Sequence, residues 1–131
     1  EQGQLLPNVT FSEDQTYATI TEDVVRNVLL NDFTPGEELH RIIPKFLFKQ
    51  ATAPFMAAAQ LTEEKFGAVN KYYVRASVDK VLSPELQGRM LESWNMDEIF
   101  TLPSGHFPLN TMPEKLYDLI RKASLTLSIR H

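Results

Sequence analysis

The first half of the chain alternates short β-prone runs with short amphipathic runs. Residues 8–11 and 16–20 are rich in Val, Thr, Tyr and Phe, and the polar residues between them predict a hairpin. Apolar residues over 24–29 then repeat at helical spacing, which predicts a helix of about ten residues. Thr21 precedes this run at a position where its hydroxyl would cap the first turn.

A second helix is predicted after Thr34. Pro35 suits the first helical position, and Glu37 suits the third, where it would complete a capping box with Thr34. Pro44 weakens the end of this helix because proline cannot donate the helical hydrogen bond. Residues 45–60 show no clean period, so we expect irregular structure there.

The second half of the chain follows the order strand, turn, helix, strand, loop and helix. Residues 71–76 and 99–102 are rich in aromatic and β-branched side chains, which predicts two strands. Ser83 is a good N-cap for the helix between them, and residues 111–114 form a capping box for the last helix. A strand, a helix and a strand at this spacing predict a right-handed crossover between parallel strands.

This change of pattern divides the chain near residue 68. Residues 1–67 are expected to form a helical segment with a short hairpin, and residues 68–131 an α/β segment of βαβα order. The expected fold class is therefore α/β. A chain of 131 residues has the length of one domain.

Composition and charge argue against several classes of protein. The net charge of −4 and the scattered Lys and Arg residues argue against a nucleic-acid or anionic membrane surface. No apolar run approaches the length of a transmembrane helix. The chain has no cysteine, which excludes disulfides, thiolate metal sites and cysteine nucleophiles. We therefore expect a cytoplasmic protein.

Two chemically useful side chains follow the two predicted strands. Asp79 stands in the turn after residues 71–76, and His106 follows residues 99–102 behind Gly105. The carboxyl ends of parallel strands share one edge of a sheet, and sites collect at that edge. A carboxylate beside an imidazole is two-thirds of an acyl-transfer triad. Each residue alone is equally well explained as a turn-forming Asp or a loop His, but their joint placement favours catalysis.

Four segments carry a resemblance to a known family. They are the approach to the first strand, the acidic turn, the start of the next helix and the histidine loop: residues 61–69 with 71–74, residues 77–80, residues 83–87, and Gly105 with His106. These segments resemble the plant methylesterase and hydroxynitrile lyase branch of the α/β-hydrolase superfamily. In that superfamily the acid also precedes the histidine along the chain. The resemblance is specific over residues 61–116 and loose over residues 1–60.

The resemblance implies a partial α/β-hydrolase fold, in which a helical lid is followed by the last βαβ unit and the C-terminal helix. Asp79 and His106 would be the acid and the histidine of a Ser-Asp-His triad, and residues 1–67 would form the lid. The nucleophile is absent, since none of the seven serines lies in a Gly-x-Ser-x-Gly elbow. The chain also begins at Glu1 rather than at Met. We therefore expect a missing N-terminal half, or a second chain, that carries the serine.

Four apolar residues are candidates for substrate binding: Phe107, Leu109, Phe55 and Met56. The first two adjoin the histidine, and the last two lie in the expected lid. Side chains of this kind usually line ligand sites, although packing of the lid explains Phe55 and Met56 more simply. We expect no cofactor and no metal, because the three histidines, His40, His106 and His131, lack a ligand spacing.

The expected function is that of an α/β-hydrolase of carboxylic-ester hydrolase type, acting on small-molecule esters. Hydroxynitrile lyases carry a lysine after the histidine where this chain has Phe107, so lyase activity is the third choice. The alternative is a non-catalytic fragment or binding module derived from an α/β-hydrolase. Two parallel strands make a poor sheet alone and leave an exposed edge, so we expect a homodimer or binding to the missing half.

Overall fold

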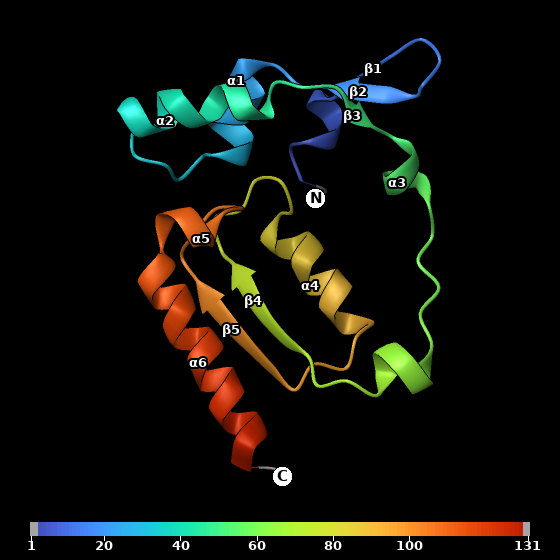
Figure 1. The fold of residues 1–131 in the computed structure, drawn as a ribbon, viewed down its shortest axis with the longest axis vertical. Helices are drawn as coiled ribbons and strands as arrows, with labels where there is room; N and C mark the ends of the chain where they lie inside the picture. Colours follow the sequence, from blue (N-terminus) through green and yellow to red (C-terminus); the bar gives the residue numbers. More distant parts are fainter. Residues whose placement is uncertain (1–2, 130–131) are drawn as a thin grey trace.

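A computed structural model of the chain describes residues 3–129, with side chains to residue 126. Figure 1 shows an upper part of short helices and a small sheet, and a lower part in which two strands lie between two helices. The lower strands point toward the upper part, so their carboxyl ends lie beneath it. Within residues 3–129, no helix is both long and apolar enough to cross a membrane.

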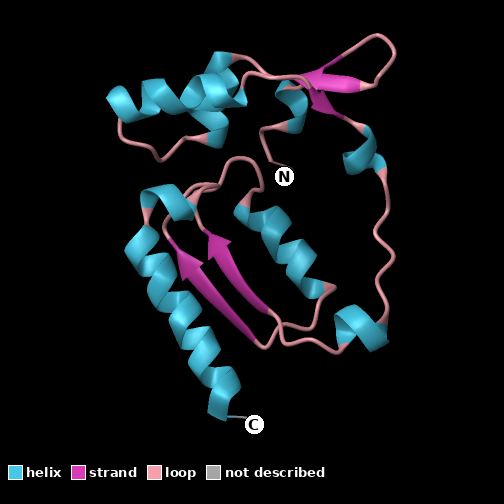
Figure 2. Ribbon diagram, viewed as in Figure 1, coloured by secondary structure: helices cyan, strands magenta, loops and turns pink. Residues whose placement is uncertain are grey.

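The lower part is built on two strands, β4 (Tyr72–Ala76) and β5 (Glu98–Leu102). They pair in parallel, the first residue of one opposite the first of the other and the last opposite the last. α4 (Pro84–Glu92) connects the strands and packs beside β4, and α6 (Pro113–Ile129) packs against β5 (Figure 2). The predicted strands, their parallel pairing and both helices are therefore confirmed.

The upper part contains the short elements: η1 (Leu6–Asn8), β1 (Thr10–Phe11), β2 (Tyr17–Thr19), α1 (Glu22–Val24), η2 (Val25–Leu29), α2 (Glu37–Ile42), η3 (Ile43–Phe46), β3 (Gln50–Ala51) and α3 (Ala53–Met56). A single helical turn, η4 (Glu63–Gly67), precedes β4. β1 and β2 form the predicted antiparallel hairpin. Thr21 accepts from the N–H of Val24, so its predicted cap is also confirmed.

The largest buried cluster lies in the upper part, in the stretch from α1 to η3: Val24, Val25, Val28, Leu29, Leu30, Leu39 and Ile43. Val24, Val25, Val28 and Leu29 form the apolar face that the sequence predicted for the first helix, and Leu39 and Ile43 belong to the stripe predicted for the second. Leu30, directly after η2, was not predicted. Val81 and Phe107 of the lower part pack against the same cluster. Apolar contact therefore joins the upper part to the two loops that follow β4 and β5.

Two predicted caps are wrong, and β3 was not predicted. Gly36, with an extended backbone, directly precedes α2, so the helix begins too late for Thr34 to cap it. Thr111 is the last residue of α5 (Pro108–Thr111), and its hydroxyl donates to Asp32 rather than capping α6. β3 exists because its two residues pair with β2, a tertiary contact without a local signal.

A buried glutamine fixes the end of β4. Gln87 is 1% exposed; its amide donates to the carbonyls of Ala76 and Leu82 at 2.9 and 2.8 Å. Its carbonyl oxygen accepts from the N–H of Ala76 at 3.0 Å and from the Tyr73 hydroxyl at 3.3 Å. The Ala76 groups face away from β5, since the next N–H, of Ser77, bonds to β5. Gln87 thus takes the place of a neighbouring strand at the last residue of β4.

We expect Gln87→Leu to lower the free energy of unfolding by about 2–4 kcal/mol. The substitution leaves two buried groups of Ala76 without partners, and each such loss costs about 1–3 kcal/mol. Urea unfolding followed by circular dichroism measures the change. Gln60→Leu makes the same replacement at an exposed position and should stay within about 0.5 kcal/mol of wild type. Equal effects of the two substitutions would contradict this role of Gln87.

Candidate active site

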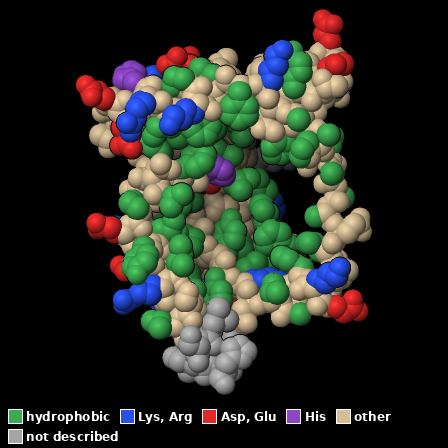
Figure 3. Space-filling view, viewed as in Figure 1, with side chains coloured by type: hydrophobic (Ala, Val, Ile, Leu, Met, Phe, Trp, Pro, Cys, Tyr) green, Lys and Arg blue, Asp and Glu red, His purple; other side chains and the backbone are tan. Residues whose placement is uncertain are grey.

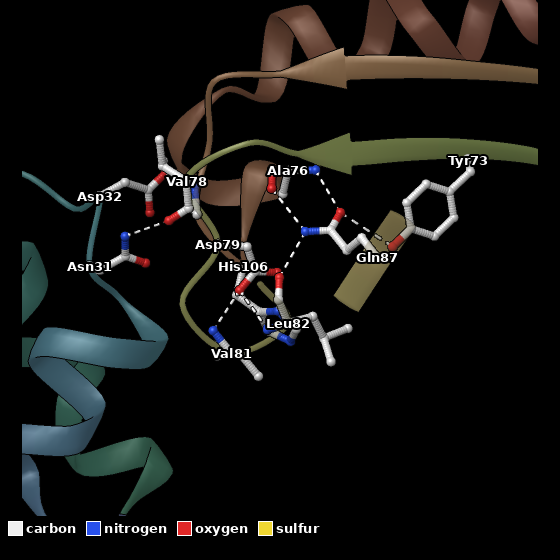
Figure 4. A network of polar contacts seen from close by, with 11 residues as sticks. Asn31, Asp32, Tyr73, Ala76, Val78, Asp79, Val81, Leu82, Gln87 and His106 are labelled. Carbon is white, nitrogen blue, oxygen red and sulfur yellow. Dashed lines mark hydrogen bonds and ion pairs between the residues drawn. The ribbon is translucent and has the colours of Figure 1, made fainter. Parts of the chain in front are cut away.

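Asp79 and His106 meet where β4 and β5 end. His106 Nδ1 lies 2.8 Å from Asp79 Oδ2 (Figure 4). The side chain of Asp79 is 4% exposed and that of His106 is 30% exposed. The pair therefore combines a buried carboxylate with an imidazole that solvent or a substrate can reach.

Asp79 also organises its own turn. Its Oδ1 accepts from the N–H groups of Val81 and Leu82 at 2.7 and 3.1 Å. Asp79 therefore does stabilise the turn after β4, as expected of an aspartate at this position. It uses only one of the two carboxylate oxygens, and the other is left for His106.

The contact with Asp79 indicates which ring nitrogen of a neutral His106 would carry the proton. A carboxylate can only accept hydrogen bonds, so Nδ1 of His106 donates to Asp79. The lone pair then lies on Nε2, where the ring can take a proton from another group. This arrangement is suited to general base catalysis, with the resulting imidazolium stabilised by Asp79.

A line of polar contacts runs from β4 to Asp79. Burial raises the pKa of the Tyr73 hydroxyl, and the negative charge of Asp79 raises it further, against a smaller lowering by Arg75. Tyr73 is therefore protonated at neutral pH and donates to Gln87. Gln87 in turn binds the carbonyl of Leu82, whose N–H donates to Asp79. The strand, α4 and the acidic turn are thus held as one unit.

The four apolar candidates for substrate binding lie in two places: Phe107 and Leu109 follow His106, whereas Phe55 and Met56 lie on α3. Phe107 lies edge-on to the His106 ring, with ring centroids 5.1 Å apart, and its other neighbour is Phe46 at 5.5 Å. Leu109 follows on α5 and is 71% exposed. Phe55 and Met56 are 75% and 82% exposed on α3, at the opposite side of Figure 1 from α5.

Two site residues were missed by the sequence analysis. Asn31 donates from Nδ2 to the carbonyl of Val78 at 2.8 Å, and Asp32 accepts from the N–H of Gly105 at 2.6 Å (Figure 4 draws both). These contacts span 47 and 73 residues. In sequence, Asn-Asp after a helix signals only that the helix ends, so no local pattern could have found them.

His131 lies outside the described residues, and His40 is exposed on α2. Within the described ranges, no group of three or more His, Asp and Glu side chains is placed to hold a metal ion.

Comparison with known proteins extends this picture. No family model matches the chain. Methylesterase 17 of Arabidopsis thaliana is 25% identical over 120 residues, which cover 88% of this chain and 43% of that protein. The alpha-hydroxynitrile lyase of the same plant is 26% identical over 94 residues, covering 71% of this chain and 34% of the lyase. Among solved structures, the pyrethroid hydrolase PytH superposes with a TM-score of 0.75 at 21% identity, covering 94% of this chain and 49% of that one.

The chain spans less than half the length of each of these three proteins. The superposition covers nearly all of the chain, so the α/β-hydrolase fold is shown even where identity is low. The chain therefore has part of an α/β-hydrolase fold and is similar to esterase-type members of that superfamily, in its plant methylesterase and hydroxynitrile lyase branch.

Proposed function

We propose that this chain supplies the acid and the base of a Ser-Asp-His triad in a carboxylic-ester hydrolase. The observation that carries the proposal is the 2.8 Å contact between His106 Nδ1 and Asp79 Oδ2 at the carboxyl ends of two parallel strands. His106 takes the proton of a serine hydroxyl as the serine attacks the ester carbonyl. It then gives that proton to the leaving alcohol, while Asp79 stabilises the imidazolium between the two steps.

The serine is proposed to come from a segment or a chain outside these residues. Two observations support this part of the proposal. The sheet of the lower part has only two parallel strands, whereas parallel sheets are normally larger and covered on both faces. Hydrophobic side chains also gather around the opening beside α4 (Figure 3). A further strand beside β4, brought by the missing half or by a second copy, would extend the sheet. It would also cover the hydrophobic side chains around the opening.

Residues 1–67 are proposed as the lid, and the upper part is the portion of them that lies over the site. The buried cluster of the upper part packs against Phe107, in the histidine loop. Phe107 and Leu109 are proposed to contact the substrate from the lower part. Phe55 and Met56 are proposed to contact it from the lid once the missing part is in place, since their exposure leaves them free to pack.

Ester hydrolysis is favoured over cyanohydrin cleavage by the surroundings of Phe107. Its ring packs against Phe46 and His106 and puts no cation beside the imidazole. A small-molecule ester with an apolar group suits such a wall. Measurement of ester turnover distinguishes an enzyme from the non-catalytic alternative, a fragment or binding module.

We expect His106→Ala to lower kcat/KM for p-nitrophenyl acetate by at least about a thousandfold in the natural protein that contains this chain. Loss of a triad member typically costs this much or more, because serine then loses its base. Release of p-nitrophenol measures the rate. His40→Ala removes an exposed histidine of α2 and should leave the rate unchanged. A wild type without turnover, or equal rates for both variants, would support the non-catalytic alternative.

We expect Phe107→Ala to raise KM for aryl esters more than it lowers kcat. The change removes apolar wall beside the imidazole and leaves the contact between Asp79 and His106 in place. A comparison of p-nitrophenyl acetate with p-nitrophenyl butyrate measures the effect, which should be larger for the longer acyl chain. Phe11→Ala, at an exposed position of β1, is the matched control. An unchanged KM would remove Phe107 from the substrate site.

A further inference from the structure

The loop after η2 touches both loops that carry the candidate catalytic pair. Asn31 donates from Nδ2 to the carbonyl of Val78, the residue before Asp79, at 2.8 Å. Asp32 accepts through Oδ2 from the N–H of Gly105, the residue before His106, at 2.6 Å. We call these two adjacent side chains the Asn31–Asp32 bridge. The loop after η2 thus binds both the residue that precedes Asp79 and the residue that precedes His106.

The Asp32 contact extends beyond the histidine loop. The same Oδ2 accepts from the Thr111 hydroxyl at 2.9 Å, at the end of α5. Asp32 therefore binds the chain on both sides of His106, before it at Gly105 and after it at Thr111. Hydrogen bonds from a backbone N–H to a carboxylate are among the stronger ones in proteins, so this contact limits how far the loop can move.

Gly105 is the residue that makes the approach possible. A Cβ at this position would lie 2.5 Å from Asp32 Oδ1 and 2.7 Å from Asn31 Oδ1. Real side chains do not come so close, so any other residue would push the bridge away from the loop. The small residue before the histidine and the two polar residues of the upper part thus fit one another.

Two oxygens of the bridge, Asn31 Oδ1 and Asp32 Oδ1, are buried without a hydrogen bond in the part of the chain that the structure describes. Burying polar oxygens in this way is unfavourable, and each such group calls for an explanation. A role in the site is one, because the two bridge atoms that do have partners, Asn31 Nδ2 and Asp32 Oδ2, bind the loops that carry Asp79 and His106.

We infer that the Asn31–Asp32 bridge positions the catalytic pair: it sets the distance and angle between Asp79 and His106 by holding the two loops to the upper part. The inference rests on the proposed function for calling the pair catalytic. The bridge touches the residues next to the pair, so it acts through their backbone and takes no part in proton transfer itself. Movement of the upper part is thereby coupled to the alignment of the pair.

The test follows the ring N–H of His106 by NMR in the natural protein that contains this chain, labelled with ¹⁵N-histidine. A proton held between Nδ1 and Asp79 exchanges slowly with water, and His106→Ala assigns its signal. We expect Asp32→Ala to speed its exchange about ten- to hundredfold, the loss expected for hydrogen bonds to a charged group, and Asn31→Ala, which removes a neutral contact, to speed it about three- to tenfold. The melting temperature, recorded in parallel, should show that both variants remain folded.

The matched control is Asp14→Ala. Asp14 also accepts from a backbone N–H and a threonine hydroxyl, both of Thr16, but on the exposed hairpin turn. It should leave the exchange of the His106 proton unchanged. Gly105→Ala keeps both bridge side chains and removes the space for them, so it should reproduce the effect of Asp32→Ala. Should Asp32→Ala not fold, Asn31→Ala, whose contact is at the surface, decides the matter.

Exchange within twofold of wild type in folded Asp32→Ala and Asn31→Ala would overturn the inference. A wild-type chain without a protected His106 proton would overturn it too, and the proposed catalytic pair with it. If the His106 proton is protected and the bridge substitutions speed its exchange, but the protein has no esterase turnover, the proposed function is rejected. The positioning role of the Asn31–Asp32 bridge then still holds. The two claims therefore fail by different observations.

Discussion

The hydrogen bond between Asp79 and His106 joins the ends of two parallel strands, and much of the structure serves to hold its two sides in place. On the Asp79 side, the second carboxylate oxygen is bound by the turn, and the turn is bound by Gln87. On the His106 side, the loop is short and runs directly into α5. A pair of this kind works only if neither side drifts, because proton transfer depends steeply on alignment.

The two sides are held by different physical means. β4, α4 and the acidic turn are fixed by buried polar contacts around Gln87, which replaces a neighbouring strand. Within the lower part, the histidine loop is bound to the acidic turn by the N–H of Val78, which donates to the carbonyl of Ser104 at 3.1 Å. The loop is also held from above, by the packing of Phe107 on the buried cluster and by the contact of Asp32 with Gly105. The upper part therefore supports the candidate site through contacts with the loops of Asp79 and His106.

The sequence predicted most of what depends on local signals. The hairpin, the longer helices and the two strands follow from spacing and caps, and Asp79 and His106 follow from the strand order. The short helices α3 and α5 were not predicted, and α3 lies where irregular structure was expected. The failures at Thr34 and Thr111 arose where a good cap residue was used otherwise or stood too far from the helix. β3, Asn31 and Asp32 depend on partners far along the chain, and a single sequence carries no signal of such pairing. The proposed serine lies outside these residues, so no pattern within them could identify it.

The central claim is that Asp79 and His106 activate a serine supplied from elsewhere. Labelling of the natural protein with a fluorophosphonate probe, followed by mass spectrometry of its peptides, tests this claim most directly. We predict one labelled serine outside these 131 residues, with labelling lost in His106→Ala and retained in His40→Ala. Labelling that is absent, or that does not depend on His106, would contradict it.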